Sequence, residues 1–256
     1  MKKIIFFLCT ATLVLSLVCT ANAGKIVLAN DEWTLSNTGF SGPNDPATFA
    51  TNVASWFTGG LPGNFLAYSN NFGFTQSSLS TAMTGAGNSW TVSTAGVFDT
   101  TTLLGYDGVF IGGFLADNSV LIDYVEAGGN VYLAGGTATL GSSSQEAAAW
   151  NTFLNNFGLG FGTSYNGVGG NISISSAHPI FNGVDSLYQN NGNDTLDILA
   201  SDPRAEVLVT LNGHGLYAVY DSSAAPVPEP ATMLLLGTGL VGLAGFGRKK
   251  FLKKQN

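Results

Sequence analysis

Short apolar runs alternate with amphipathic stretches along most of this chain of 256 residues. The run at 130–134 is typical of a strand buried on both faces, whereas 145–157 places Trp150, Phe153 and Phe157 at helical spacing. Repeated strand-helix alternation predicts an α/β fold with a mostly parallel sheet and helices on both faces. The predicted strands are 25–30, 64–68, 90–93, 106–112 and 130–134, and the predicted helices are 47–57, 78–83, 119–127 and 145–157.

A β-hairpin is predicted near the end of this pattern. Two strand-like segments, 206–211 and 216–220, flank Asn212-Gly213, a dipeptide that favours the tight turn of an antiparallel pair. Glycine is unusually abundant, at 34 of 256 residues, which indicates a body rich in loops. Surface loops are predicted where Gly, Asn, Ser and Pro gather, at 36–46, 163–170 and 189–193.

The charged residues are distributed unevenly. Residues 24–226 hold two basic side chains, Lys25 and Arg204, against fifteen acidic ones, a formal net charge of −13. A body with that charge repels phosphate backbones, so nucleic acid is excluded as a partner. The other seven Lys and Arg lie at the two ends of the chain.

Residues 1–23 show the three parts of a secretory signal peptide. Lys2 and Lys3 precede an apolar run over 4–18, and the small residues Ala21 and Ala23 suit a signal peptidase. We expect cleavage after Ala23. An uncleaved N-terminal anchor is the alternative, but the apolar run is short for that role.

Both cysteines, Cys9 and Cys19, lie within this predicted signal peptide. A lipoprotein site at Cys19 is disfavoured, because the bulky Val18 precedes it and no Leu stands three places before it. Cleavage therefore leaves a protein with no thiol and no disulfide, although an exported protein is free to form disulfides.

The C-terminal end has three parts. A small-residue and proline spacer at 222–230 precedes 17 uncharged residues, 231–247, and a basic tail, 248–256. A helix over 231–247 spans roughly 25 Å, at the short limit for crossing the inner membrane. The tail then stays in the cytoplasm and the body outside. The basic residues that stop transfer are Arg248, Lys249 and Lys250.

A plain tail anchor is the alternative, but the spacer ends in Val227-Pro228-Glu229-Pro230. This motif, followed by a short Gly-rich span and a basic end, resembles the PEP-CTERM sorting signal of secreted proteins in Gram-negative bacteria that make exopolysaccharide. The resemblance implies that a membrane-embedded exosortase recognises Pro228, Glu229 and Pro230 and processes a transient anchor. Two prolines also keep the segment extended, as a processing enzyme requires.

The body, residues 24–221, carries a second resemblance. The segments 106–113 and 121–136, with His178-Pro179-Ile180 further on, are similar to a class I glutamine-amidotransferase-like domain, which implies a flavodoxin-like α/β fold over about 25–185. Catalytic members carry a Cys after the strand that corresponds to 131–134. This chain has Gly135-Gly136-Thr137 there, so thiol chemistry is excluded.

Hydroxyl groups near this turn are the remaining candidate nucleophiles. Thr137 or one of the serines at 142–144 would need His178 or His214 as a base, and spacing does not bring them together. Capping of a helix is the alternative role for these hydroxyls. The two isolated histidines also make a poor transition-metal site, and surface or packing roles are favoured for both.

The acidic residues lack regular ligand spacing. Asp185, Asp194 and Asp197 are candidates to bind calcium. The alternative, that they lie in a solvated acidic loop, is favoured. Asp31 and Glu32 follow the first strand, where parallel sheets gather ligands, but no partner for a carboxylate pair is identifiable. We expect neither a metal nor a cofactor.

Aromatic side chains are candidates for stacking on sugars, although most are expected in the core. Phe72 and Phe74 are the pair expected to be exposed. The sequence thus favours a non-catalytic cell-surface or matrix protein associated with exopolysaccharide. The acidic charge of the body and its amide-rich loops suit such a matrix better than a negatively charged substrate. The alternative is a secreted polysaccharide or ester hydrolase that uses a hydroxyl or a carboxylate pair. The other aromatic candidates are Trp33, Phe40, Trp56, Tyr68 and Trp90.

Overall fold

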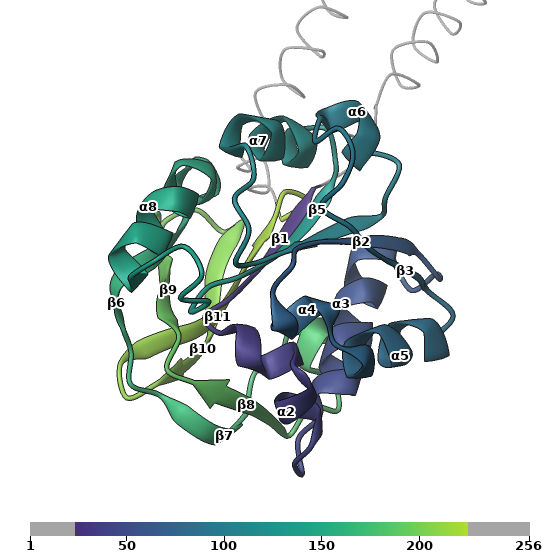
Figure 1. Cartoon of the computed structure of the whole chain (residues 1–256). Coiled ribbons are helices and arrows are strands. Elements are labelled where there is room, and N and C mark those ends of the chain that lie inside the picture. The colour runs from purple at the N-terminus through teal and green to yellow at the C-terminus, as the bar shows by residue number, and fades with distance from the viewer. Residues whose placement is uncertain (1–23, 225–256) are drawn as a thin grey trace, which may run out of the picture. The chain divides into compact units, whose positions relative to one another are not determined.

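Seven strands form one sheet in the computed structural model, which describes residues 24–224 (Figure 1). The predicted signal peptide and sorting segment lie outside the described residues. The strand order is β10-β11-β1-β5-β4-β2-β3, and the last five strands are mutually parallel, as the sequence predicts. The parallel strands are β1 (Lys25–Ala29), β2 (Asn64–Tyr68), β3 (Ser89–Val92), β4 (Gly108–Ile111) and β5 (Asn130–Ala134).

Helices cover both faces of the sheet, and the chain path explains which helix lies on which face. From β1 through β2 to β3 the chain crosses the sheet in one direction, and through β4 and β5 it returns. Because crossovers between parallel strands are right-handed, reversing direction moves the helices to the other face. The helices are α2 (Asn37–Phe40), α3 (Pro46–Thr58), α4 (Phe72–Thr75), α5 (Ser77–Gly85), α6 (Thr100–Leu103), α7 (Asn118–Glu126) and α8 (Ser143–Leu154), with 3₁₀ turns η1 (Glu32–Leu35), η2 (Asn155–Phe157) and η3 (Pro179–Phe181).

Each face has its own buried core. Phe49 of α3 and Met83 of α5 pack on one face with Phe110 and Tyr132. On the other face, α6, α7 and α8 bury their apolar sides, including the fully buried Trp150 of α8. Alternate residues of β1 join different cores, which is what the two-residue period of a strand buried on both faces requires.

The predicted hairpin is present as β10 (Ala205–Leu211) and β11 (His214–Asp221). Asn212 and Gly213 both have positive φ, 53° and 84°, as a type I′ turn requires. β11 also pairs antiparallel with β1. The Ser222 N–H donates to the Gly24 carbonyl oxygen (3.2 Å), so the two ends of the body meet where β1 begins.

Two predicted loops contain strands instead. The loop predicted at 163–170 overlaps β6 (Leu159–Tyr165) and β7 (Gly169–Ser173), and the loop at 189–193 overlaps β8 (Ser186–Asn190) and β9 (Asn193–Asp197). β6 pairs with β9 and β7 with β8, in two small antiparallel sheets. The sequence misled because these strands are rich in Asn, Gly and Ser, residues that are depleted in strands and typical of turns.

The strand order also differs from the flavodoxin-like order of 2-1-3-4-5, because β1 lies beside β5 at the far side of the parallel group. The likeness of the body to glutamine amidotransferases stays a prediction. Among residues 24–224, no helix has the length and apolar composition needed to cross a membrane. The predicted span at 231–247 lies outside that range.

Candidate functional site

The C-terminal edge of the sheet, where the parallel strands end, gathers polar side chains. Asp31 and Glu32 follow β1, Asn71 follows β2, and Thr137 follows β5. Glu146, from the first turns of α8, joins them because the Thr137 hydroxyl and N–H both donate to its carboxylate. The topology therefore brings together three carboxyl groups that are far apart in the sequence.

Each carboxyl group has hydrogen-bond donors of its own. Asp31 accepts from the backbone N–H groups of Trp33 (2.8 Å) and Asn190. Glu32 accepts from the Asn71 side-chain amide at 2.7 Å. These bonds tie the residues after β1 to the ends of β2 and β8, so they connect separate loops.

Burial dominates the electrostatics of this cluster. It raises the pKa of Asp31 to about 6 and that of Glu32 to about 8, and the neighbouring carboxylates add to both shifts. Burial also raises the pKa of Glu146, against the hydrogen bonds from Thr137. Glu32 is therefore largely protonated at neutral pH.

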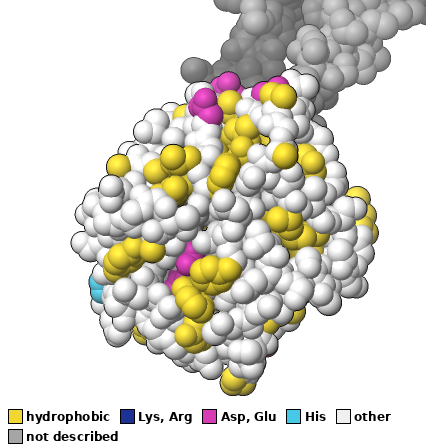
Figure 2. Space-filling view, in the orientation of Figure 1, with side chains coloured by type: hydrophobic (Ala, Val, Ile, Leu, Met, Phe, Trp, Pro, Cys, Tyr) yellow, Lys and Arg dark blue, Asp and Glu magenta, His cyan; other side chains and the backbone are white. Residues whose placement is uncertain are grey.

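Solvent has little access to these groups. The exposed fractions of Asp31, Glu32 and Glu146 are 0%, 4% and 1%. In Figure 2, acidic side chains reach the surface between α8 and the C-terminal end of β1 at one small hollow, flanked by hydrophobic side chains. Within residues 24–224, no group of three or more His, Cys, Asp or Glu side chains is placed to hold a metal ion. The cluster connects loops, and its three carboxyl groups are almost entirely buried.

The candidate nucleophiles have structural partners. Ser142 caps α8 in a reciprocal capping box with Gln145, and the Ser143 hydroxyl donates to the Thr163 carbonyl oxygen (2.9 Å). Thr137 is committed to Glu146. In the described part of the chain, no Ser or Thr hydroxyl is hydrogen-bonded to a ring nitrogen of His178 or His214.

The three acids weighed for calcium are not brought together. Asp194 lies within β9 and accepts a hydrogen bond from Nδ1 of His214 (2.9 Å). Asp197 is three residues further along the same strand, so its side chain points to the other face. Asp185 lies just before β8, where its N–H donates to Asp45.

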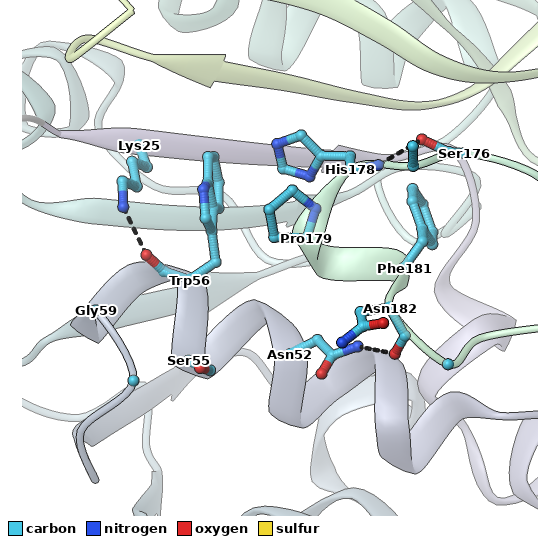
Figure 3. Close-up of a pocket in the computed structure, with 13 residues that line it drawn as sticks. Lys25, Asn52, Ser55, Trp56, Gly59, Ser176, His178, Pro179, Phe181 and Asn182 are labelled. Atoms are coloured by element: carbon cyan, nitrogen blue, oxygen red, sulfur yellow. Dashed lines mark hydrogen bonds between the residues drawn. The ribbon is translucent and has the colours of Figure 1, made fainter.

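A pocket of about 770 Å³ lies at the opposite, N-terminal edge of the sheet, where the parallel strands begin. The residues that line it come from the start of β1, the C-terminal half of α3 and the segment at 176–183 around η3 (Figure 3). Apart from three glycines and Ala177, they are Lys25, Asn52, Ser55, Trp56, Ser176, His178, Pro179, Phe181 and Asn182.

Trp56 stands between the two basic groups of this pocket (Figure 3). The Lys25 ammonium lies 4.8 Å from the centre of the indole ring and donates to the Trp56 carbonyl oxygen (2.6 Å). On the other side, the His178 ring meets the indole edge-on, with centroids 5.1 Å apart. Burial lowers the pKa of both Lys25 and His178, and nearby Asp221 opposes this.

Asn52 fixes one wall of the pocket. Its amide donates to the carbonyl oxygens of Ile180 (3.3 Å) and Asn182 (2.7 Å), which joins α3 to η3. The side chains of Asn182 and Ser55 remain exposed. The wall therefore combines a fixed backbone with accessible amide and hydroxyl groups.

Of the aromatic candidates, Trp56 is the one that lines this pocket. The expectation that Phe72 and Phe74 form an exposed pair is wrong. Both lie in α4, where Phe74 is 1% exposed and Phe72 packs edge-on against Trp33 with ring centroids 4.7 Å apart. A loop composition of Asn and Gly hid a short helix that turns Phe74 into the core.

Sequence reasoning missed the pocket itself. Its parts come from three separated segments, and Asn52 and Asn182 carry no motif. One signal was present in the sequence, since Lys25 is one of two basic residues in the body. Partial burial of an ammonium group costs free energy unless the group is paired or hydrogen-bonded, as Lys25 is to the Trp56 carbonyl oxygen.

Comparison with known families concerns the C-terminal end. Residues 226–249 match the PEP-CTERM protein-sorting motif, and the matched range includes Pro228, Glu229 and Pro230. The chain carries a PEP-CTERM sorting signal. Such a signal indicates export to the cell surface of a Gram-negative bacterium and processing by an exosortase. No curated protein and no solved structure matches the chain significantly.

Proposed function

We propose that this PEP-CTERM protein is a non-catalytic component of the cell surface that binds exopolysaccharide through the pocket beside Trp56. The observation that carries the proposal is the lining of that pocket. Side-chain amides, hydroxyl groups, an imidazole and an indole surround a space of about 770 Å³. Sugars are bound by such mixed polar and aromatic surfaces, and the volume is in the range of small-ligand sites.

The absence of catalysis is part of the proposal. Acyl or glycosyl transfer needs a positioned nucleophile and base, or two accessible carboxyl groups. Among the described residues, Asp, Glu and Tyr do not line the pocket, and its serines are not bonded to the imidazole ring. The three carboxyls at the other edge, which a hydrolase would need to expose, are buried and engaged by neighbouring donors.

Retention in the matrix tests this function. The full chain would be expressed in a Gram-negative host that has an exosortase, with and without exopolysaccharide synthesis. We expect matrix retention to depend on the polysaccharide and to be lost in Trp56→Ala. Trp33→Ala is the matched control, because Trp33 packs on Phe72 away from the pocket. Circular dichroism of each purified variant separates loss of binding from loss of folding.

Three results would contradict the proposal. Equal release of the protein into the medium of both strains would remove the polysaccharide as its partner. Release of new reducing ends from the isolated polysaccharide by the purified full chain would show a hydrolase instead. A folded Trp56→Ala variant that is retained as well as the parent would move the binding site elsewhere.

Recognition of the sorting signal is a separate part of the proposal. Replacement of Glu229 by Gln, or of Pro228 and Pro230 by Ala, is expected to leave export intact and to trap the protein in the inner membrane. Membrane fractionation and mass spectrometry of the mature C-terminus measure this. Unchanged release of both variants would show that the exosortase does not read these three residues.

A further inference from the structure

The pocket beside Trp56 differs in charge from the rest of the body. The body carries a formal net charge of −13, yet the pocket is lined by one of its two basic residues, Lys25, and by no acidic residue. A second cavity at the same edge, of about 310 Å³, is lined by Asp107. The lining of the larger pocket thus contains a cation in a body that is otherwise strongly acidic.

The pocket also offers N–H donors. The Lys25 ammonium uses one N–H on the Trp56 carbonyl oxygen, which leaves two. Nδ1 of His178 accepts a hydrogen bond from the Ile180 N–H (3.4 Å), so in the neutral ring the proton is assigned to Nε2. These donors match a ligand that brings acceptor oxygens.

We infer that the pocket binds the carboxylate of an acidic sugar, a uronate unit of a polysaccharide, with Lys25 as its counter-ion. The inference rests on the proposed binding of exopolysaccharide and names the class of sugar. Asn182, Ser55 and Ser176 are placed along the wall to bind ring hydroxyl groups. A singly charged carboxylate suits a pocket with one full positive charge, whereas phosphate groups usually engage several donors, often from Arg.

From the sequence, the negative net charge of the body disfavours a negatively charged ligand. The structure shows that this net charge does not describe the pocket. Surface charges more than about 8 Å apart are largely screened at physiological ionic strength. Since acidic side chains are absent from the lining, the contact within the pocket decides recognition. Asp221, the cross-strand partner of Lys25, lies close to it and favours its charged form, but it is not among the lining residues.

The test compares two probes that differ only in whether each sugar unit carries a carboxylate or a neutral hydroxymethyl group. Oligogalacturonate and the same oligosaccharide after reduction of its carboxyl groups would be titrated into the full chain in detergent micelles. We expect oligogalacturonate to bind at least about tenfold more tightly, a factor equivalent to about 1.4 kcal/mol. Lys25→Gln should abolish this preference. Arg204→Gln, which removes the other cation of the body outside the pocket, should keep it.

The outcomes separate this inference from the proposed function. Equal binding of both probes overturns the acidic-sugar inference and leaves polysaccharide binding in place. If neither probe binds while the protein is still retained in the matrix, the inference is again overturned alone. If the protein is also not retained, both fall. Equal loss of preference in Lys25→Gln and Arg204→Gln would show an effect of net charge and overturn the role of the pocket.

Discussion

The polar groups at the two edges of the central sheet differ in their exposure to solvent and in their partners. At the C-terminal edge, three carboxyl groups are buried and bonded to the backbone or side chains of neighbouring loops. At the N-terminal edge, a partly buried ammonium lies beside an open pocket. Polar residues after parallel strands usually mark a ligand site. In this body they join the loops together, and the accessible chemistry lies at the other edge.

The largest effect is expected where the C-terminal edge is most tightly closed. A Cβ added at Gly192 would lie 2.0 Å from the backbone oxygen of Asn30 and 2.6 Å from its carbonyl carbon. We expect Gly192→Ala to destabilise the body by more than about 3 kcal/mol, because a clash with backbone must displace a loop. Urea unfolding of the full chain in detergent, followed by tryptophan fluorescence, measures this.

Gly85→Ala is the control, since a Cβ at Gly85 meets nothing within 4 Å. It should leave stability unchanged or raise it by up to about 1 kcal/mol. If the two variants are equally stable, the C-terminal edge is looser than the close approach of Gly192 and Asn30 implies.

The second effect concerns pH. The unfolded chain ionises its carboxyl groups near pH 4, whereas folded Asp31 and Glu32 keep their protons to about pH 6 and 8. The folded state therefore binds more protons in between, and stability falls as pH rises from about 4 to 8. We expect Glu32→Gln, which stays neutral, to be more stable than the parent at pH 8.5 by about 2 kcal/mol.

Thermal unfolding across pH 4.5 to 8.5 checks this prediction. Glu206→Gln, at an exposed position of β10, is the control and should follow the parent curve. A parent protein whose stability rises steadily from pH 5 to 8 would mean that the carboxyl groups are ionised in the folded state and that the edge is open to water.

A smaller effect is expected at the N-terminal edge. Asn52→Leu removes both hydrogen bonds from α3 to the segment around η3. We expect a loss of about 1 kcal/mol, together with faster amide hydrogen exchange in residues 176–183. Thr51→Leu, on the adjacent position of α3 and outside the pocket lining, is the control. Unchanged exchange in Asn52→Leu would show that the pocket wall is rigid without this link.

The smallest effect is expected at the His214–Asp194 pair, whose side chains are about a third exposed. His214→Gln should change stability by less than about 0.5 kcal/mol, because exposed ion pairs contribute little.

Calorimetry with and without calcium extends the test to the acids at 185, 194 and 197. A calcium-dependent rise in the unfolding temperature would contradict the separation of these carboxylates.

The sequence predicts the parts of this body that follow a regular period. Each strand of the parallel group, the two longest helices and the Asn212-Gly213 hairpin are near their predicted positions, because burial on both faces and turn chemistry leave a local pattern. The small sheets were missed, since strands such as β7 contain Gly and Asn and pack on one side only.

The candidate sites show a sharper limit. Asp31 and Glu32 are recognisable in the sequence as polar residues after a strand. Glu146 is more than a hundred residues away and reaches them only in the folded chain, where Thr137 binds its carboxylate. Lys25 and His178 likewise contact opposite sides of Trp56 only because the fold brings three distant segments together. Such groupings depend on how strands are ordered in the sheet, and no local spacing records that order.

The hydrogen bond between Ser222 and Gly24 has a practical consequence for engineering. β1 and β11 are neighbours, and this hydrogen bond joins the outer end of one to the outer end of the other. The two ends of the body therefore lie side by side, as insertion of a domain into another protein requires. The body can be spliced into a surface loop of an unrelated carrier with short linkers on both sides. Joining these ends directly, and opening the chain at an exposed turn such as Asn212-Gly213, would give a circular permutant with the same sheet.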